Sequence, residues 1–223
     1  MTHDPGASGP AAGSEAGSEA APVAVGPWTR RTRRVAYVNP WLTVWHDEVD
    51  RPDGSAGIYG VVHFASIAVG VVAIDAQDRV ALVGQHRYTL DSHSWEIPEG
   101  GADPAEGALA GARRELQEET GAVARSWRVL GTAHLSNSVT DEAAVLFLAT
   151  DLVLGADARE ASEHDLACRW VPFPDVVAMC RDGRITDGLT LIAIGWAALD
   201  RAGVTAPPGV DTDAAGPVSS GER

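Results

Sequence analysis

The chain has 223 residues, a 45% hydrophobic content and a formal net charge of −14. All 17 of its basic residues are arginine, which excludes chemistry that needs a lysine side chain, such as Schiff-base formation. An acidic chain without a basic run is unsuited to a nucleic-acid backbone, and no apolar run is long enough to predict a membrane span. We therefore expect a cytoplasmic protein that binds neither nucleic acid nor membrane.

The first part of the chain changes character near residue 27. Residues 1–26 consist mainly of Gly, Ala, Ser, Pro and Glu without periodicity, which predicts a disordered leader. Beyond them, apolar runs bounded by turn residues predict a series of strands. These strands are expected at 35–38, 42–49, 58–65, 67–74, 80–85 and 94–97.

The acidic stretch that begins at Gly100 predicts a helix with both ends marked. Asp103 is expected as its N-cap, with Pro104 in the first turn and Glu106 as a capping-box acid. Gly121 stands where helices often end in a left-handed residue. Four apolar residues at helical spacing predict the buried face: Ala105, Leu109, Ala112 and Leu116.

The remainder of the chain alternates strands and helices before its composition changes again. Strands are predicted at 127–134, 143–148 and 168–171, and helices at 174–181 and 187–202. The pattern indicates a single α+β domain with a mixed β-sheet over residues 27–203. The residues from 204 to 223 are rich in Pro, Gly, Ala and Asp and predict a disordered tail.

Three glutamates of the predicted helix should lie on nearly the same side of it. Glu115, Glu118 and Glu119 are three and four residues apart, so their side chains emerge within roughly 100° of arc. Like charges at this spacing repel one another, and a bound cation would remove that repulsion. Clustered carboxylates suit a hard ion, and we expect Mg²⁺, with Mn²⁺ as the alternative.

The pattern of this stretch resembles the complete Nudix box of the Nudix hydrolase family. The resemblance rests on Gly100, Glu106 and the run Arg114-Glu115-Leu116-Gln117-Glu118-Glu119-Thr120-Gly121-Ala122. Ala122 departs from it, because the family prefers a larger aliphatic residue there. The resemblance implies an α/β/α sandwich with a mixed sheet and the hydrolysis of a nucleoside diphosphate linked to another moiety.

The same resemblance implies a role for each residue of the box. Glu115 and Glu119 would be metal ligands, with Glu118 and the backbone carbonyl of Glu99 as further ligands. Arg114 would pair with Glu106 and hold the helix in register. Gly100, Glu106, Arg114 and Gly121 are then structural positions.

The general base is expected outside the helix. Asp141 and Glu142 lie in the loop where related ADP-ribose-type enzymes carry a catalytic glutamate. Of the two, Glu142 is favoured, and Glu118 is the alternative. A polar loop acid without any role is the simpler interpretation of Glu142, and it stays open.

Weaker signals concern the substrate. The segments around Arg87 and Glu96 resemble those of ADP-ribose and sugar-nucleotide pyrophosphatases. The fork of Arg87 suits phosphate oxygens, and Glu96 would help to position metal or water unless it is only a strand-edge acid. ADP-ribose pyrophosphatases usually have a proline where this chain has Asn137 and Ser138, so another nucleoside diphosphate derivative is also open.

Three functions follow from these observations. The favoured one is Mg²⁺-dependent hydrolysis of the pyrophosphate bond of ADP-ribose or a related nucleoside diphosphate derivative, giving a nucleoside monophosphate and a sugar phosphate. The alternatives are a housecleaning nucleoside triphosphate pyrophosphatase and a non-catalytic nucleotide-sugar sensor. Related enzymes are commonly dimers, and the strand-rich segment 34–65 is compatible with a homodimer.

Overall fold

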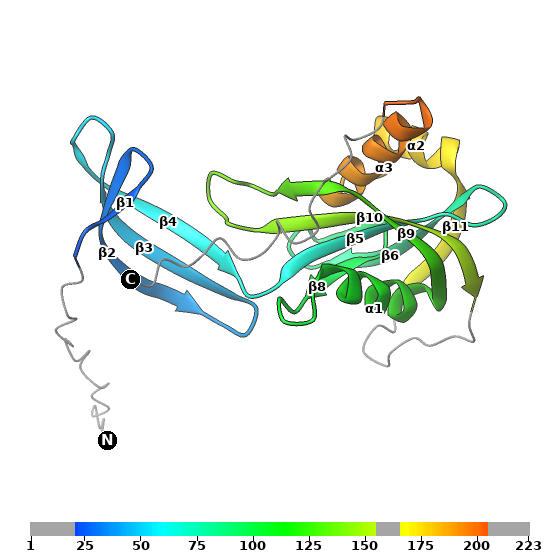
Figure 1. Cartoon of the computed structure of the whole chain (residues 1–223), viewed down its shortest axis with the longest axis horizontal. Helices are drawn as coiled ribbons and strands as arrows, with labels where there is room; N and C mark the ends of the chain where they lie inside the picture. The colour runs from blue at the N-terminus through cyan, green and yellow to red at the C-terminus, as the bar shows by residue number, and fades with distance from the viewer. Residues whose placement is uncertain (1–20, 155–165, 205–223) are drawn as a thin grey trace, which may run out of the picture. The chain divides into compact units, whose positions relative to one another are not determined.

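The computed structural model describes residues 21–154 and 166–204 (Figure 1). By its internal contacts the chain divides into two compact units. The first unit comprises the chain up to Arg34 and His46–Tyr59. The second unit comprises Val35–Trp45 and the chain from Gly60 onward. The first sheet has four strands in chain order: β1 Val23–Val25, β2 Trp28–Val38, β3 Leu42–Asp50 and β4 Ala56–Phe64. β1 belongs to the first unit, and β2, β3 and β4 each have residues in both units.

The second unit contains two further sheets and three helices. One sheet has the strand order β8-β5-β10-β9, with β5 parallel to β10 and antiparallel to β8; the other has the order β11-β6-β7. The strands are β5 Ile67–Ala73, β6 Arg79–Arg87, β7 Ser92–Glu96, β8 Glu99–Ala102, β9 Ala122–His134, β10 Ala143–Leu154 and β11 Ala167–Pro172. The helices are α1 Ala108–Thr120, α2 Phe173–Asp182 and α3 Gly188–Arg201.

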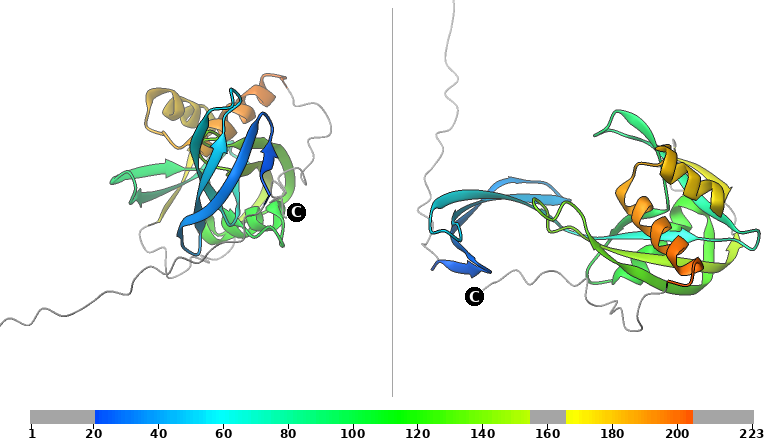
Figure 2. Two further views of the ribbon diagram at one scale, coloured as in Figure 1. Left: turned by 90° about the vertical axis from the view of Figure 1, so that its left-hand side faces the viewer. Right: turned by 90° about the horizontal axis from the view of Figure 1, so that it is seen from above.

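The helices cover both faces of the β8-β5-β10-β9 sheet. Successive residues of a strand point to opposite faces, and β5 shows this clearly. Val69 and Val71 pack in a core with Ala112 and Leu116 of α1. Val72 packs in a second core that includes the buried apolar residues of α2 and α3. The result is a helix–sheet–helix arrangement, visible in Figures 1 and 2, and it confirms the predicted α/β/α sandwich with a mixed sheet.

The acidic helix ends as predicted but begins later. Gly121 adopts φ 69°, and its N–H donates to the carbonyl of Gln117 at 2.9 Å. The first helical residue is Ala108, after a turn in which Asp103 Oδ1 accepts from the N–H of Ala105 at 2.8 Å. The capping signal at Asp103 therefore orders a separate turn, because Gly107, with φ 82°, breaks the helical path.

The predicted buried face of this helix is correspondingly only half right. Ala112 and Leu116 are buried, whereas Ala105 and Leu109 are exposed. The buried side of α1 includes two acids, Glu115 and Glu119. Apolar spacing could not predict this side because Glu115 and Glu119 lie against the backbone of Gly100 and Glu99.

Two further predictions concern the ends of the chain. β1 lies inside the predicted disordered leader and pairs antiparallel with β2, so that prediction is wrong for Val23–Val25. Residues 1–20 and 205–223 lie outside the described residues. Within the part that is described, no helix is long and apolar enough to cross a membrane.

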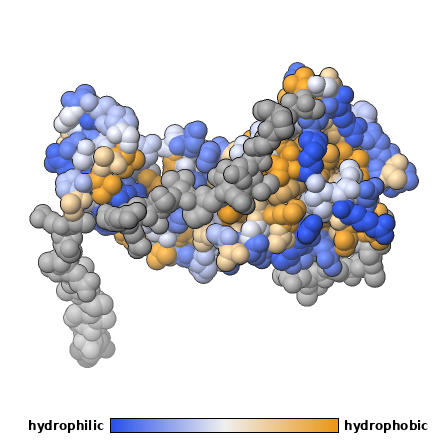
Figure 3. All heavy atoms as spheres, viewed as in Figure 1, coloured by the Kyte–Doolittle hydropathy of each residue, from blue (hydrophilic) through white to orange (hydrophobic). Residues whose placement is uncertain are grey.

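Apolar side chains reach the surface near the turn between β2 and β3. Val35, Tyr37, Val38 and Trp41 are all exposed. Figure 3 shows hydrophobic residues among polar ones over the visible surface. Isolated exposed apolar residues are ordinary, but these four fall within one short segment of the chain.

Candidate functional site

Arg114 organises the exposed part of the acidic helix. Its Nη1 lies 2.9 Å from Glu115 Oε1 and 2.8 Å from Glu118 Oε2, and its Nη2 donates to the carbonyl of Gly101 at 2.7 Å. The predicted pair with Glu106 is present but loose, with 3.8 Å between Nε and Oε1. Arg114 thus joins α1 to β8 through the carbonyl of Gly101, whereas its contacts with Glu115 and Glu118 lie within α1.

The two buried acids of α1 lie against the start of β8. A Cβ at Gly100 would lie 2.2 Å from Oε1 of Glu115, so only glycine leaves room for this carboxylate. The carboxylate of Glu119 accepts a hydrogen bond from the N–H of Glu99 at 3.1 Å. The two acids therefore meet the backbone of Glu99 and Gly100, where the resemblance placed a backbone metal ligand.

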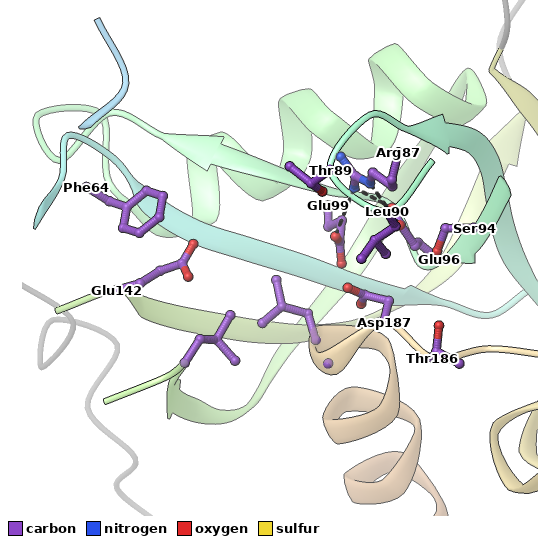
Figure 4. Close-up of a pocket in the computed structure, with 13 residues that line it drawn as sticks. Phe64, Arg87, Thr89, Leu90, Ser94, Glu96, Glu99, Glu142, Thr186 and Asp187 are labelled. Atoms are coloured by element: carbon purple, nitrogen blue, oxygen red, sulfur yellow. Dashed lines mark hydrogen bonds and ion pairs between the residues drawn. The ribbon is translucent and has the colours of Figure 1, made fainter. Parts of the chain in front are cut away.

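A cavity of about 600 Å³ opens beside this region (Figure 4). Its lining combines a few apolar side chains with Arg87, Glu96, Glu99, Glu142 and Asp187. A cavity with one arginine and several converging carboxylates suits a ligand that carries phosphate and metal ions. The acids of α1 are not among its lining residues.

Arg87 binds two acids in the wall of this cavity. Its Nε donates to Glu96 Oε1 at 2.9 Å, its Nη2 donates to Glu96 Oε2, and its Nη2 lies 3.3 Å from Glu99 Oε1. The hydrogen bonds that Arg87 donates to Glu96 are the main reason that the pKa of the Arg87 guanidinium is raised. The side chain of Glu96 is only 2% exposed, so Arg87 compensates a buried charge.

Glu99 has the most unusual environment of these acids. Burial, followed by the nearby carboxylates of Asp187 and Glu96, raises the pKa of Glu99 well above its ordinary value, and Arg87 only partly opposes them. Glu99 Oε2 is buried and has no hydrogen-bond partner among the described residues. Glu96, Glu99 and Asp187 each offer a carboxylate oxygen within 4.8 Å of the others.

Asp187 is the site residue that sequence reasoning missed. It is the N-cap of α3, and its Oδ2 accepts from the N–H of Thr190 at 2.7 Å. The Oγ1 of Thr190 in turn accepts from the N–H of Ile97 at 3.0 Å, which joins α3 to the segment between Glu96 and Glu99. Its place at a helix start was visible in the sequence, but its nearness to Glu99 depends on tertiary packing.

The two acids of the loop before β10 have different surroundings. Asp141 Oδ2 lies 2.6 Å from Nδ1 of His63, and Asp141 Oδ1 accepts from the N–H of Phe64 at 3.3 Å. The ring of Trp45 stacks on His63 at 4.7 Å between centroids. Glu142 instead lines the cavity, and its pKa is raised by burial and then by the charge of Asp141. Asp141 thus anchors the loop, and Glu142 faces the cavity.

The structure therefore brings the predicted site residues together in two groups. Arg87, Glu96, Glu99 and Glu142 share the cavity. Glu115, Glu118 and Glu119 lie on α1, where Glu119 accepts a hydrogen bond from the N–H of Glu99 and Glu115 lies against Gly100. These are positions in the fold, and the predicted roles of the residues remain predictions.

The donors present fit a hard divalent cation. All the candidate ligands are carboxylate oxygens, which Mg²⁺ and Mn²⁺ prefer. Oε2 of Glu99, buried and without a hydrogen-bond partner among residues 21–154 and 166–204, is an acceptor that a cation would satisfy. A metal ion would therefore be compatible with the residues of this region.

Comparison with protein families gives two adjoining matches. Residues 65–188 match the NUDIX domain, and residues 28–62 match the nucleoside diphosphate sugar hydrolase N-terminal domain. The first match contains α1 and most of the residues that line the cavity, including Asp187. The second contains β2, β3 and most of β4.

Individual relatives are similar over most of their length. One is a CMP-5′-(N-acetyl-N-hydroxy-3-aminopropyl)phosphonate hydrolase of Streptomyces rubellomurinus, 31% identical over 82% of this chain and 87% of that protein. Another is an ADP-ribose pyrophosphatase of Mycobacterium tuberculosis, 30% identical over 75% of this chain and 81% of that protein. A crystal structure of an ADP compounds hydrolase has the same fold, with a TM-score of 0.71, 19% identity and coverage of 82% of this chain and 100% of that one.

Proposed function

The chain belongs to the Nudix hydrolase family, and from this we propose that it hydrolyses the pyrophosphate bond of ADP-ribose or a related nucleoside diphosphate derivative. The reaction would use Mg²⁺, or Mn²⁺ in its place, and would release a nucleoside monophosphate and a sugar phosphate. The observation that carries the proposal is the cavity with Arg87 and four carboxylates beside the acids of α1. The activities named for the similar proteins concern ADP-ribose and a CMP-phosphonate.

The acids of α1 are the proposed metal-binding residues. Glu115 and Glu119 would bind the ion with the backbone carbonyl of Glu99, and Glu118 would contribute a further carboxylate. A bound Mg²⁺ supplies a polarised phosphoryl oxygen and a more acidic water. The buried positions of Glu115 and Glu119 support this assignment, because carboxylates beside a strand's backbone need a cation or hydrogen bonds to offset their burial.

Arg87 would bind the pyrophosphate. Its Nε and Nη2 are used by Glu96 and Glu99, and we assign Nη1 to a phosphate oxygen. Glu96 would then be a positioning residue, because its bidentate contact fixes the plane of the guanidinium.

Glu142 is the residue that we assign as general base. It lines the cavity, and its raised pKa brings it closer to the pH at which a base accepts a proton from water most effectively. Asp141 is held by His63 and Phe64, so it is the poorer candidate. Glu118, which is bound to Arg114, stays the alternative.

A product screen tests the proposal. The chain would be incubated with ADP-ribose, other nucleoside diphosphate sugars, a CMP-linked phosphonate and nucleoside triphosphates, with and without Mg²⁺. Alkaline phosphatase, which attacks only exposed monoesters, would reveal the cleaved diphosphates. Release of pyrophosphate from triphosphates alone would support a housecleaning enzyme, and silence on every compound with metal present would support a sensor.

We also propose that the chain acts as a cytoplasmic homodimer. The exposed apolar residues Val35, Tyr37, Val38 and Trp41 support association through the strand-rich segment. Sedimentation analysis of the full chain would test it. A monomer at micromolar concentration, unchanged by Trp41→Ser, would contradict the proposal.

A further inference from the structure

Positions 99 and 100 of β8 face opposite sides of the β8-β5-β10-β9 sheet. Gly100 pairs with Val69, whose side chain packs on the α1 side, and its own Cβ position faces Glu115. Glu99 pairs with Gly70, one residue further along β5. Because successive residues of a strand alternate between faces, the side chain of Glu99 points away from α1, toward the start of α3 and Asp187.

Three carboxylates meet on that second face. Glu96, Glu99 and Asp187 come from the end of β7, the start of β8 and the N-cap of α3, and an oxygen of each lies within 4.8 Å of the others. Figure 4 shows Asp187 pointing toward Glu96 and Glu99 from the opposite wall of the cavity. Carboxylates so close repel one another unless a positive charge lies among them.

The charge of this group is not balanced by the arginine beside it. Arg87 supplies one positive charge and binds both oxygens of Glu96, but it reaches only Oε1 of Glu99. Glu99 Oε2 is buried without a hydrogen-bond partner among the described residues, and the side chain of Glu99 is only 9% exposed. When all three carboxylates are ionised, the one guanidinium leaves a charge of about −2, the deficit that one divalent cation fills.

We propose that Glu96, Glu99 and Asp187 form a second divalent-cation site, separate from the acids of α1 and on the other face of β8. Glu99 Oε2 and an oxygen of Asp187 are its main ligands. Glu96 adds a lone pair that Arg87 leaves available, since each carboxylate oxygen can accept more than once. The remaining coordination positions face the cavity and would be filled by water or, if the proposed function holds, by phosphate oxygens of the substrate.

The second cation site can be tested separately from the Nudix box, because it depends on the side chain of residue 99. The box uses only the backbone of this residue, so a change of side chain at position 99 leaves the carbonyl and the N–H that Glu119 binds. Glu99→Gln keeps the size of the side chain and removes its charge. Asp187→Asn does the same on the other wall and retains an oxygen that can cap α3.

Manganese binding to the full chain tests the proposal without a substrate. Free Mn²⁺ would be measured by electron paramagnetic resonance during a titration of the wild type, Glu99→Gln, Asp187→Asn and Glu119→Gln. We expect Glu99→Gln and Asp187→Asn each to remove one bound ion per chain, or to weaken it by about 10-fold or more. Glu119→Gln should lose a different ion and keep this one.

The matched control is Asp175→Asn, which removes one negative charge from an exposed position of α2. It should leave both the number of bound ions and their affinity unchanged. Circular dichroism would show that each variant is folded. Unchanged Mn²⁺ binding in folded Glu99→Gln and Asp187→Asn would overturn the second site, and so would an equal loss in Asp175→Asn.

Failure of the second cation site can be distinguished from failure of the proposed hydrolytic function. Hydrolysis of a nucleoside diphosphate derivative by the wild type, together with unchanged Mn²⁺ binding in Glu99→Gln, would remove only the second site. Loss of one ion in that variant, with no hydrolysis of any compound by the wild type, would keep the second site and remove the enzyme assignment.

Discussion

In two regions of this protein one arginine lies among several acids. The regions differ in how deeply the acids are buried and in which elements of the fold supply them. On α1, Arg114 contacts Glu115 and Glu118, and its partner Glu118 is 30% exposed. In the cavity, Arg87 contacts Glu96, which is 2% exposed, and Glu99. The α1 group comes from neighbouring turns of one helix, whereas the cavity group needs β6, β7, β8 and α3 to pack together. The α1 group can therefore be predicted from sequence spacing, whereas the cavity group depends on tertiary packing.

The largest expected effect concerns the proposed metal ligands of α1. Glu119→Gln should reduce turnover by about 10³-fold or more, because it removes one charged ligand while retaining a group that can accept from the N–H of Glu99. Steady-state hydrolysis at saturating Mg²⁺ would measure it. A variant with full activity would show that the α1 group is only structural.

The next effect concerns the proposed base in the cavity. Glu142→Gln should reduce kcat by about 10²-fold or more. Because burial raises the pKa of Glu142, its basic form is lost as the pH falls through that raised value, so the acid limb of the pH–rate profile should lie above the ordinary range of a glutamate. The profile of the variant should lack this limb. A wild-type rate would instead return the role to Glu118.

The difference in burial between the acids that the two arginines bind should be visible in stability. Arg87→Met leaves the buried Glu96 without its partner and should lower the free energy of unfolding by about 2 kcal/mol, less than for a fully buried pair because Arg87 is 37% exposed. Arg114→Met should cost less, about 1 kcal/mol, because its partners Glu115 and Glu118 are 12% and 30% exposed and so keep more contact with water than Glu96 does. Urea denaturation of both variants measures the two costs, and equal values would contradict the distinction.

The smallest pair of effects compares a long-range hydrogen bond with a local one. Thr190→Val removes the buried acceptor of the Ile97 N–H and should cost about 1–2 kcal/mol. Thr120→Val removes a contact within the last turn of α1, to the carbonyl of Leu116, and should cost about 0.5–1 kcal/mol. Thermal unfolding followed by circular dichroism would order them. A larger loss for Thr120→Val would show that the end of α1 contributes more than the anchorage of α3.

The sequence predicted the parts of this molecule that depend on local chemistry. The strands from β3 to β7, the last residues of β2 and the end of α1 at Gly121 follow from periodicity and turn residues. The predicted start of α1 was wrong because the capping signal at Asp103 orders a separate turn that ends at Gly107. The short strand β8 was missed because Glu99–Ala102 has almost no apolar pattern.

For the cavity group, the sequence predicted most of the individual residues but not that they would lie close together. Arg87, Glu96, Glu99 and Glu142 were recognised as separate positions, but nothing in their spacing indicated that Asp187 would join Glu96 and Glu99. That contact depends on the hydrogen bond between Thr190 and the N–H of Ile97, which joins segments far apart in the chain. Burial of charge is likewise a property of the packed fold, so neither the state of Glu99 nor the role of Asp141 as an anchor for His63 could be inferred beforehand.

Gly100 has a consequence for the way this gene can change over time. A Cβ at this position would lie 2.2 Å from Oε1 of Glu115, so a mutation to any other residue displaces that acid at once. A mutation of Glu115 to a smaller residue would make room, but it would remove the carboxylate or, as aspartate, draw it back from Gly100. A single change at either position therefore moves or removes the carboxylate that lies against Gly100.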